Sequence, residues 1–463
     1  MEINCKTIAA LVQGKIVTEA NQEAEVKRVV IDSRGVQAGD FFVPFAGEHT
    51  DGHRFIAQAA DSGAVGCFVD QTAELTPPSE LCAIAVPETL IALQQLAHGY
   101  RLQYTLPIVA VTGSVGKTTT KDLIAAALSG RYQVLKTEGN LNNQIGLPIM
   151  LTRLTSKTEV AVLEMGMSGL GEIAALAQLA VPSIGVITNI GESHLEMLGS
   201  REGIAQAKCE LLQSLPADGV AVVNADEPLL EPYWRELACP VITFGFSRKA
   251  VIRPAAGKTG GKAKKVQIEQ AGYPPLVVTP PLPGRHNIYN LLAAVAVGRA
   301  LELTNAEIEA GLAQLQLSGM RLEITTLPVG YTVINDAYNA SPTSVAAALN
   351  VLREEAGEHG KIAVLGDMLE LGALEEEGHR QVGRLAAASR LKGLVVLGPR
   401  SPWIAAGAQE AGMAAEMIVQ CTTHVQAAEA VELLAQAGDW LLLKGSRGMQ
   451  MEEVLKLLQR VEA

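Results

Sequence analysis

One stretch of the chain, PIVAVTGSVGKTTTKDLIAAAL at 107–128, constrains the fold more than any other segment. A run of β-branched and small apolar residues leads into a glycine turn, and after Lys117 apolar residues recur at helical spacing up to Gly130. This order of strand, loop and helix brings the N–H groups of the loop and the positive end of the helix to one point, where phosphate oxygens can be held. We therefore predict a phosphate-binding loop at the end of a buried strand.

The loop departs from the common pattern GxxxxGK[ST], because Val111 stands where the first glycine is expected. The turn at Gly113 and the close approach at Gly116 remain, so the groups that hold phosphate are kept. Lys117 can neutralise the outer phosphates, and the Thr118 hydroxyl can hold Mg²⁺. The alternative is a plain glycine turn with an exposed lysine, which the GK[ST] order after a buried strand disfavours.

Length and composition limit the classes of protein to consider. A chain of 463 residues exceeds one compact core and should form roughly two to four domains, with three as the central expectation. Its 48% hydrophobic and 4% aromatic residues suit an α/β protein built on aliphatic sheets. The net charge of −12 argues against nucleic acid as the main partner. The six cysteines are scattered without the spacing of a zinc site or a disulfide framework.

The start of the chain, MEINCKTIAALVQGK, is not typical of a secretion signal. No window approaches about 18 uninterrupted apolar residues, the length that would cross a membrane. We expect a cytoplasmic protein without a membrane span.

The succession of strands and helices predicts three α/β domains. Residues 1–104 mix short strands with helices, the strands being VKRVVIDSR, DFFVPF, AVGCFVD and CAIAVP. Residues 105–319 alternate apolar runs such as VAVLEM, IGVITNI and VAVVNAD with Ala/Leu-rich helices, which indicates a mostly parallel sheet. Residues 320–463 repeat the alternation, with YTVINDAY, KIAVLGD, LKGLVVLG and DWLLLKG, as a Rossmann-like doubly wound domain. The Gly/Lys-rich RPAAGKTGGKAKKV at 253–266 suggests a mobile surface loop.

Polar residues stand where strands of the second domain end. Glu164 closes VAVLEM, and His194 follows IGVITNI. Ligands of a doubly wound sheet bind beyond the carboxyl ends of its strands, so both residues should converge on the phosphate loop. Mg²⁺ prefers oxygen ligands, which favours Glu164, whereas a lone histidine is as readily a packed or surface residue. Lys208 in GIAQAKCELL, taken alone, reads as a solvated lysine, and Asn287 and Asn290 either meet a nucleoside or cap a helix.

Segments from most of the chain resemble the Mur ligases, which are ATP-dependent amide-forming enzymes of peptidoglycan synthesis. The segments are TGSVGKTTT, GNLNNQIGLP, LEMGMSGLGEI, NIGESHLEMLGS, AKCELL, GRHNIYNLLAA, SGMRLE, NDAYNASP and KGSRG. This family's loop also lacks the first glycine. DAYNASP at 336–342 and KGSRG at 444–448 are most similar to the branch that adds D-alanyl-D-alanine to UDP-N-acetylmuramoyl-tripeptide. The DNPR-type motif and KGHE-like ending expected of the enzyme that adds the third residue are absent from the sequence.

The resemblance implies a division of labour among the domains. Residues 1–104 would bind the UDP-substrate, 105–319 would bind ATP, and 320–463 would close over them about a hinge near 317–320. The implied ATP-binding residues are Gly113, Ser114, Val115, Gly116, Lys117, Thr118, Thr119, Asn290, Arg321, Asp336 and Asn339. The implied Mg²⁺ ligands are Thr118, Glu164, His194 and Lys208, the last as a carbamate. The implied substrate-binding residues are Ser33, Arg34, Asp51, His53, Asn140, Asn143, Lys444 and Ser446, although Ser33 and Arg34 also suit an ordinary polar turn.

The implied reaction forms an acyl phosphate from the tripeptide carboxylate and ATP, which the amine of D-alanyl-D-alanine then attacks. The implied catalytic residues are Lys117, His194, Lys208 and Arg321. Alternatives are a sister ligase, such as the enzyme that adds the third residue or a folylpolyglutamate synthetase, and a nucleotide switch, which would show an NKxD motif that the sequence lacks. A scaffold would not need polar groups at three strand ends. We expect a monomer that acts on small molecules.

Overall fold

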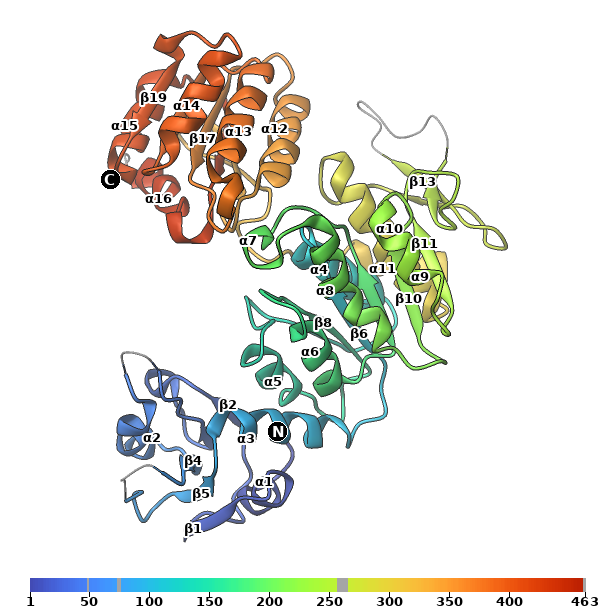
Figure 1. The fold of residues 1–463 in the computed structure, drawn as a ribbon, viewed down its shortest axis with the longest axis vertical. Coiled ribbons are helices and arrows are strands. Elements are labelled where there is room, and N and C mark those ends of the chain that lie inside the picture. The colour runs from blue at the N-terminus through green and yellow to red at the C-terminus, as the bar shows by residue number, and fades with distance from the viewer. Residues whose placement is uncertain (48–49, 73–75, 256–264, 461–463) are drawn as a thin grey trace.

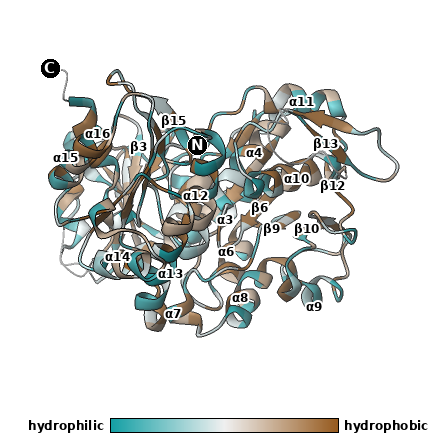
Figure 2. Ribbon diagram, turned by 90° about the horizontal axis from the view of Figure 1, so that it is seen from above, coloured by the Kyte–Doolittle hydropathy of each residue, from teal (hydrophilic) through white to brown (hydrophobic). Residues whose placement is uncertain are grey.

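The computed structural model describes residues 1–47, 50–72, 76–255 and 265–460 and places three α/β domains in a row (Figure 1). The central domain lies between the other two, each of which has its own sheet. Hydrophobic residues gather in the strands, as the brown colour of the central sheet shows (Figure 2). Residues 256–264, the middle of the predicted surface loop, lie outside the described residues.

The first domain has a five-stranded sheet in the order β1-β5-β4-β3-β2. Its strands are β1 (Lys15–Glu19), β2 (Arg28–Val30), β3 (Asp40–Phe42), β4 (Gly66–Asp70) and β5 (Cys82–Val86), and its helices are α1 (Cys5–Leu11), α2 (Ile56–Asp61) and α3 (Thr89–Arg101). The four predicted strands are confirmed as β2 to β5. The strand β1 was not predicted, because this antiparallel edge strand has residues that are all at least partly exposed and therefore carries little apolar signal.

The central domain has a six-stranded, wholly parallel sheet in the order β11-β10-β9-β6-β8-β7. These strands are β6 (Ile108–Thr112), β7 (Val134–Lys136), β8 (Val160–Glu164), β9 (Ile184–Ile187), β10 (Val220–Asn224) and β11 (Val241–Phe244). Beside it lies a small antiparallel sheet of β12 (Arg253–Pro254), β13 (Val266–Glu269) and β14 (Leu276–Val278). The parallel sheet was predicted, while the short β7 and the small sheet were not.

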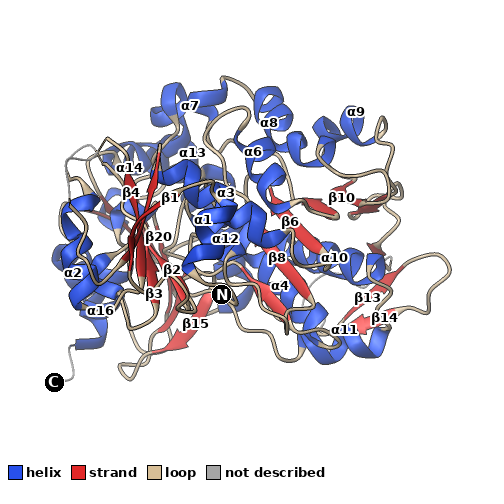
Figure 3. Cartoon of the chain, turned by 90° about the horizontal axis from the view of Figure 1, so that it is seen from below, coloured by secondary structure: helices blue, strands red, loops and turns tan. Residues whose placement is uncertain are grey.

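Helices cover both faces of the central sheet (Figure 3). One face carries α4 (Lys117–Ser129), α10 (Arg285–Ala300) and α11 (Asn305–Leu312), and the other carries α5 (Gly146–Leu151), α6 (Glu172–Ala180) and α8 (Arg201–Gln213). The short helices α7 (Leu195–Leu198) and α9 (Glu231–Trp234) lie in connections. Along β6 the side chains alternate between the faces, with Val109 and Val111 in one core and Ile108 and Ala110 in the other. The near-continuous apolar run therefore reflects burial on both sides.

The third domain is doubly wound, as predicted, with the strand order β15-β16-β20-β17-β18-β19. The strands are β15 (Glu323–Thr326), β16 (Thr332–Asn335), β17 (Lys361–Gly366), β18 (Gly393–Leu397), β19 (Ile418–Cys421) and β20 (Trp440–Lys444). The helices are α12 (Pro342–Ala356), α13 (Glu375–Ala388) and α14 (Ser401–Glu410) on one face and α15 (His424–Leu434) and α16 (Glu452–Arg460) on the other. Only β15 runs antiparallel to its neighbour.

The first two domains share one hydrophobic core, which includes Phe41 and Phe68 of the first domain and Leu163 of the central one. Two residues of α3 reinforce this joint: Tyr100 Oη donates to Leu154 O at 2.9 Å, and Arg101 Nε donates to Ala180 O at 2.9 Å. The third domain has its own two cores. Among the described residues, no helix has both the length and the apolar character needed to cross a membrane.

The helix α4 begins at Lys117 and ends before Gly130, as predicted, but the reason for the glycine differs. Its φ is −65°, which any residue can adopt. A Cβ there would lie 2.0 Å from Glu307 O, because α11 packs tightly against the end of α4. Gly130 therefore serves helix packing rather than a left-handed helix end.

Candidate active site

A cavity of about 360 Å³ lies between the central and third domains. The carboxyl ends of β6 and β8 from one sheet and of β16 and β20 from the other lead into it. Of the predicted residues it is lined by Ser114, Val115, Gly116, Lys117, Thr118, Thr119, Asn143, Glu164, His194, Asn290, Arg321, Asp336, Asn339 and Lys444. The predicted convergence of strand ends is thus observed, and it involves two sheets. The other predicted residues do not belong to the lining, and these are Gly113, Asn140, Lys208, Ser446, Ser33, Arg34, Asp51 and His53.

The loop between β6 and α4 is shaped for the close approach of an anion. Gly116 caps α4 at φ 83°, and no side chain of the described residues caps the helix, so the first N–H groups of α4 remain available. A Cβ on Gly116 would lie 2.8 Å from Asn290 Oδ1, and one on Gly113, at φ 149°, would lie 1.9 Å from Thr188 Oγ1. Both glycines are therefore required by space as well as by conformation. The departure at Val111 leaves this cradle intact, since that residue is a buried part of β6.

Lys117 folds back over the loop, and its Nζ donates to Gly113 O at 2.8 Å. Burial lowers the pKa of the Lys117 ammonium, and the nearby Glu164 carboxylate opposes that effect. A phosphate oxygen can replace the Gly113 carbonyl oxygen as the hydrogen-bond acceptor of the Lys117 ammonium. The role of Lys117 at the outer phosphates stays a prediction.

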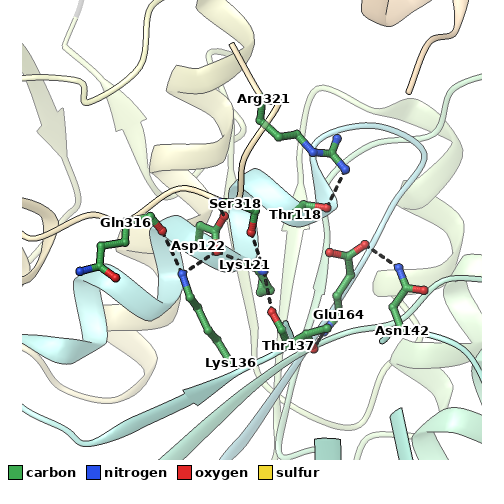
Figure 4. A network of polar contacts seen from close by, with 10 residues as sticks. All are labelled: Thr118, Lys121, Asp122, Lys136, Thr137, Asn142, Glu164, Gln316, Ser318 and Arg321. Atoms are coloured by element: carbon green, nitrogen blue, oxygen red, sulfur yellow. Dashed lines mark hydrogen bonds and ion pairs between the residues drawn. The ribbon is translucent and has the colours of Figure 1, made fainter. Parts of the chain in front are cut away.

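Glu164 lines the cavity and has one carboxylate oxygen that no described residue contacts by a hydrogen bond. Its Oε1 accepts from Asn142 Nδ2 at 2.8 Å (Figure 4), whereas its Oε2 is buried and has no hydrogen-bond partner among the described residues. A buried carboxylate oxygen without a partner is costly, so it indicates a missing ligand. A hard divalent cation suits a carboxylate oxygen beside a threonine hydroxyl, and Thr118 supplies that hydroxyl in the same cavity. The residues therefore fit Mg²⁺.

Arg321 reaches from the third domain to helix α4 of the central domain. Its Nη2 donates to Thr118 Oγ1 at 3.0 Å (Figure 4), and its guanidinium lies 4.1 Å from the centre of the Tyr338 ring. Its Nε is buried without a hydrogen-bond partner among the described residues. The Tyr338 ring fixes the plane of the guanidinium, and the Nε–H group of Arg321 remains available as a donor to an anion.

The third domain contributes an ion pair to the cavity, in which the lysine is buried and the aspartate is partly exposed. Lys444 Nζ donates to Asp336 Oδ2 at 2.5 Å and to Asn339 O at 2.9 Å. The side chain of His286, on the first turn of α10, faces this pair, and burial lowers the pKa of its imidazole to about 4. The part of the cavity nearest α10 and α12 is therefore lined by the neutral imidazole of His286, the side-chain amides of Asn287 and Asn290, and the ion pair of Lys444 and Asp336.

His194 makes a contact that the sequence did not predict. It adopts φ 66° before α7, and its Nδ1 lies 3.2 Å from Oε2 of Glu370 in the third domain. Hydrogen bonding to His194 lowers the pKa of Glu370. Within the described residues no three His, Cys, Asp or Glu side chains are grouped as a metal site would require. The role of His194 as a metal ligand stays a prediction.

The reading of Lys208 as a solvated lysine is wrong. Its side chain is 1% exposed on α8, because it lies one turn from Ile204 on the face that packs against the sheet. Burial lowers its pKa well below the ordinary value, and the charge of Lys117 adds to the effect. Lys208 donates no hydrogen bond to any described residue. Its carbamate form and its place among the metal ligands stay predictions.

The predicted substrate-binding residues of the first domain form their hydrogen bonds and ion pairs with other residues of that domain. His53 is buried, with Nδ1 2.7 Å from Asp51 Oδ1 and Nε2 accepting from the Asp70 N–H at 3.1 Å. Ser33 Oγ donates to Gln58 Oε1 at 3.1 Å. Arg34 forms an exposed ion pair with Asp32 at 2.6 Å. Their contacts with a UDP-substrate stay predictions.

Of the remaining predicted residues, Asn143 and Ser446 accept hydrogen bonds from the backbone. Asn143 Oδ1 accepts from Gly146 N at 2.9 Å at the start of α5, and Asn140 is exposed. Buried Ser446 accepts from the Leu369 N–H at 2.9 Å. These contacts locate the side chains without testing the substrate contacts that were predicted for them.

The sequence analysis missed several residues of the site, namely Asn142, His286, Tyr338 and Glu370. Asn142 stands between the two asparagines chosen from GNLNNQIGLP, and only the backbone conformation shows which of the three faces Glu164. Glu370 contacts His194 across a domain boundary, and Tyr338 packs against Arg321 from 17 positions along the chain; no local pattern reports either contact.

Three family models match the chain. The one described as Mur ligase middle domain matches 111–298, the one described as Mur ligase, glutamate ligase domain matches 320–447, and the one described as Mur ligase family, catalytic domain matches 25–101. The UDP-N-acetylmuramoyl-tripeptide--D-alanyl-D-alanine ligase of Bacillus subtilis (strain 168) is 39% identical over 454 residues, which cover 97% of each chain. The enzyme of the same name from Escherichia coli (strain K12) is 36% identical, with 93% of each chain covered.

Solved structures agree along the whole chain. A crystal structure of MurF from Acinetobacter baumannii superposes with a TM-score of 0.88 at 31% identity and covers 99% of both chains. MurF ligase from Thermotoga maritima in complex with ADP superposes with a TM-score of 0.80 at 28% identity and covers 94% of this chain and 97% of that one. With matches in all three domains, the chain belongs to the Mur ligase family.

Proposed function

We propose that the protein is an ATP-dependent ligase that joins the carboxylate of UDP-N-acetylmuramoyl-tripeptide to D-alanyl-D-alanine, which produces the pentapeptide precursor of peptidoglycan, ADP and phosphate. The observation that carries the proposal is the cavity in which the phosphate loop and Glu164 of one domain face Arg321, Asp336 and Lys444 of another. The names of the relatives at 39% and 36% identity and the ADP bound to the Thermotoga maritima enzyme support it.

The chemistry needs an activated carboxylate, because a carboxylate is a poor electrophile. One of its oxygens attacks the γ-phosphorus of ATP, the bond to the bridging oxygen breaks, and ADP leaves. Lys117 and Arg321 bind the phosphate oxygens on which negative charge collects, and Thr118 and Glu164 would hold Mg²⁺. Bound Mg²⁺ would neutralise part of the phosphate charge.

The second step forms the amide bond. The amine of D-alanyl-D-alanine attacks the acyl carbon and gives up a proton, and phosphate leaves from the tetrahedral intermediate. An acyl phosphate hydrolyses in water, so the facing surfaces of the second and third domains should exclude solvent when they close. The pair of Lys444 and Asp336 sits on the third-domain side of that closure.

The UDP-substrate is proposed to bind the first domain through Ser33, Arg34, Asp51 and His53. The first and central domains share a core, so this binding surface keeps a fixed distance from the phosphate loop while the third domain moves. We also propose that the protein is a cytoplasmic monomer.

The test is to measure phosphate release from ATP with UDP-N-acetylmuramoyl-tripeptide and D-alanyl-D-alanine and to omit each in turn. We expect release to require both, and Mg²⁺ as well. Full release without the dipeptide would contradict the proposal. A preference for a single amino acid over the dipeptide would assign the chain to a sister ligase.

A further inference from the structure

A buried ion pair lies one turn along α4 from Thr118. Lys121 and Asp122 are 0% and 1% exposed, and Lys121 Nζ lies 3.1 Å from Asp122 Oδ1. Neither residue lines the cavity. Charges in such a place are tolerated only when additional hydrogen bonds satisfy them, so their partners indicate what they hold.

The partners belong to the linker that leads from α11 to the third domain (Figure 4). The Ser318 N–H donates to Asp122 Oδ2 at 2.8 Å, and Lys121 Nζ donates to Ser318 Oγ at 3.2 Å. Lys136 at the end of β7 strengthens the attachment, since its Nζ donates to Asp122 Oδ1 at 2.8 Å and to Gln316 O at 2.9 Å. The linker is thus fixed to the central domain at two points before the third domain begins.

The same ammonium reaches toward the cavity carboxylate. Lys121 Nζ donates to Thr137 O at 2.8 Å, and Thr137 Oγ1 accepts from the Glu164 N–H at 2.9 Å. Burial acts to raise the pKa of Asp122, but the two lysines and the Ser318 N–H outweigh it, so that the pKa is lowered. Asp122 therefore stays ionised, and the network persists at neutral pH.

The attachment point controls where Arg321 can lie. Arg321 follows Ser318 by three positions, and three residues of extended chain span at most about 11 Å. Immediately after Ser318 the backbone becomes unusual, with φ 59° at Met320 and φ 50° at Leu322. The chain therefore changes direction sharply at Met320 and Leu322, while Ser318 remains hydrogen-bonded to α4.

We propose that Lys121 and Asp122 are positioning residues that hold the linker at Ser318 on the phosphate-binding helix, so that the third domain turns about the residues after Ser318 and Arg321 returns to one place over Thr118. The inference rests on the proposed function, which makes the cavity an ATP site. The pair touches no reacting atom and acts through Arg321.

A double-mutant cycle tests this dependence. Lys121→Met combined with Asp122→Leu removes both charges together, a replacement that buried ion pairs usually tolerate, whereas removal of one partner leaves an unpaired charge. We expect kcat to fall about 10- to 100-fold, as for a misplaced catalytic group, with the KM for ATP changed by less than about 3-fold. Adding Arg321→Ala to the pair should give a kcat no lower than Arg321→Ala alone, because the pair acts through that guanidinium. Losses that multiply would overturn the proposal.

Gln316→Ala is the matched control on the linker, because Gln316 enters the network only through its backbone carbonyl. It should keep the wild-type kcat, and a loss as large as that of the Lys121 and Asp122 double variant would overturn the specific role of the pair.

A structural readout separates this proposal from the proposed function. Spin labels on cysteines placed at the exposed positions 202 and 409 report the distance between the second and third domains in the full chain. Because the third domain turns about one fixed point, we expect a narrower distance distribution in the parent protein than in the double variant, and equal distributions would overturn the proposal. If the wild-type protein released no phosphate, the proposed function would fail, while the label distances would still decide whether the pair fixes the linker.

Discussion

Arg321 of the third domain donates a hydrogen bond of 3.0 Å to the hydroxyl of Thr118 in the central domain. The same hydroxyl is the proposed Mg²⁺ ligand, and the guanidinium is the proposed partner of the γ-phosphate. In the observed arrangement the Arg321 guanidinium and the Thr118 hydroxyl are therefore hydrogen-bonded to each other. Nucleotide binding must break this bond, so that Arg321 contacts phosphate and Thr118 contacts the metal.

Arg321→Ala should lower kcat by about 10²- to 10³-fold, since one charged donor to the transferring phosphoryl group is lost. ADP affinity should change little, because ADP lacks the γ-phosphate. Steady-state phosphate release and calorimetric ADP binding measure the two effects. Arg353→Ala on the exposed side of α12 is the control and should leave both unchanged. An equal loss of kcat in the two variants would contradict the role of Arg321.

Asn142→Ala should weaken the apparent affinity for Mg²⁺ by about 10- to 100-fold, the usual effect of losing a group that orients a metal ligand. The physical reason is the 2.8 Å bond by which Asn142 holds Oε1 of Glu164, so that Oε2, which has no hydrogen-bond partner among the described residues, is left as the proposed metal ligand. A magnesium titration of phosphate release measures it. Asn140→Ala is matched in chemistry and should keep the wild-type metal requirement, because no described residue is hydrogen-bonded to that side chain.

Lys208→Met should abolish most activity and raise thermal stability. Burial lowers the pKa of Lys208 in the folded state, so below the ordinary lysine pKa the unfolded chain binds more protons, and folded stability increases as pH rises through this window. Methionine removes this penalty. Thermal unfolding at several pH values between 6 and 10 should show the variant more stable at the lower end and the difference shrinking toward pH 10. Lys157→Met, at an exposed position, should show no such convergence.

His286→Asn should reduce the loss of stability in mild acid. Burial lowers the pKa of His286 to about 4 from an ordinary value of 6.5, so between these values the unfolded state binds the extra proton and stability falls as pH decreases. The full effect is at most about 3 kcal/mol. Denaturant unfolding at pH 7 and pH 4.5 measures it, with His359→Asn at an exposed site as the control. A pH dependence equal to that of the wild type would count against a neutral His286 in the folded state.

Features encoded within one strand, loop and helix were predictable from sequence. The loop after β6, the carboxylate at the end of β8 and the doubly wound third domain each follow from a local pattern of apolar residues and turns. The burial of Lys208 was also within reach, because Ile204, Leu211 and Leu212 stand at helical spacing around it and define a buried face.

Features that depend on how domains meet were not predictable. The bond between Arg321 and Thr118 joins residues 203 positions apart, and the contact of His194 with Glu370 depends on where the third domain sits. The short strand β7 gave too few residues to show a period, and β1 lacked a buried face. No local propensity carries such information, because it arises only when separate surfaces come together.

The shared core of the first and central domains has a consequence for unfolding. Residues 1–312 should melt as one cooperative body, while the third domain, joined through a linker and polar contacts, should melt as another. A scanning calorimeter should then record two transitions, and brief proteolysis should nick the chain after Ser318, where the strained turns begin. The enzyme is thus expected to behave as two cooperative bodies built from three domains, with one hinge between them.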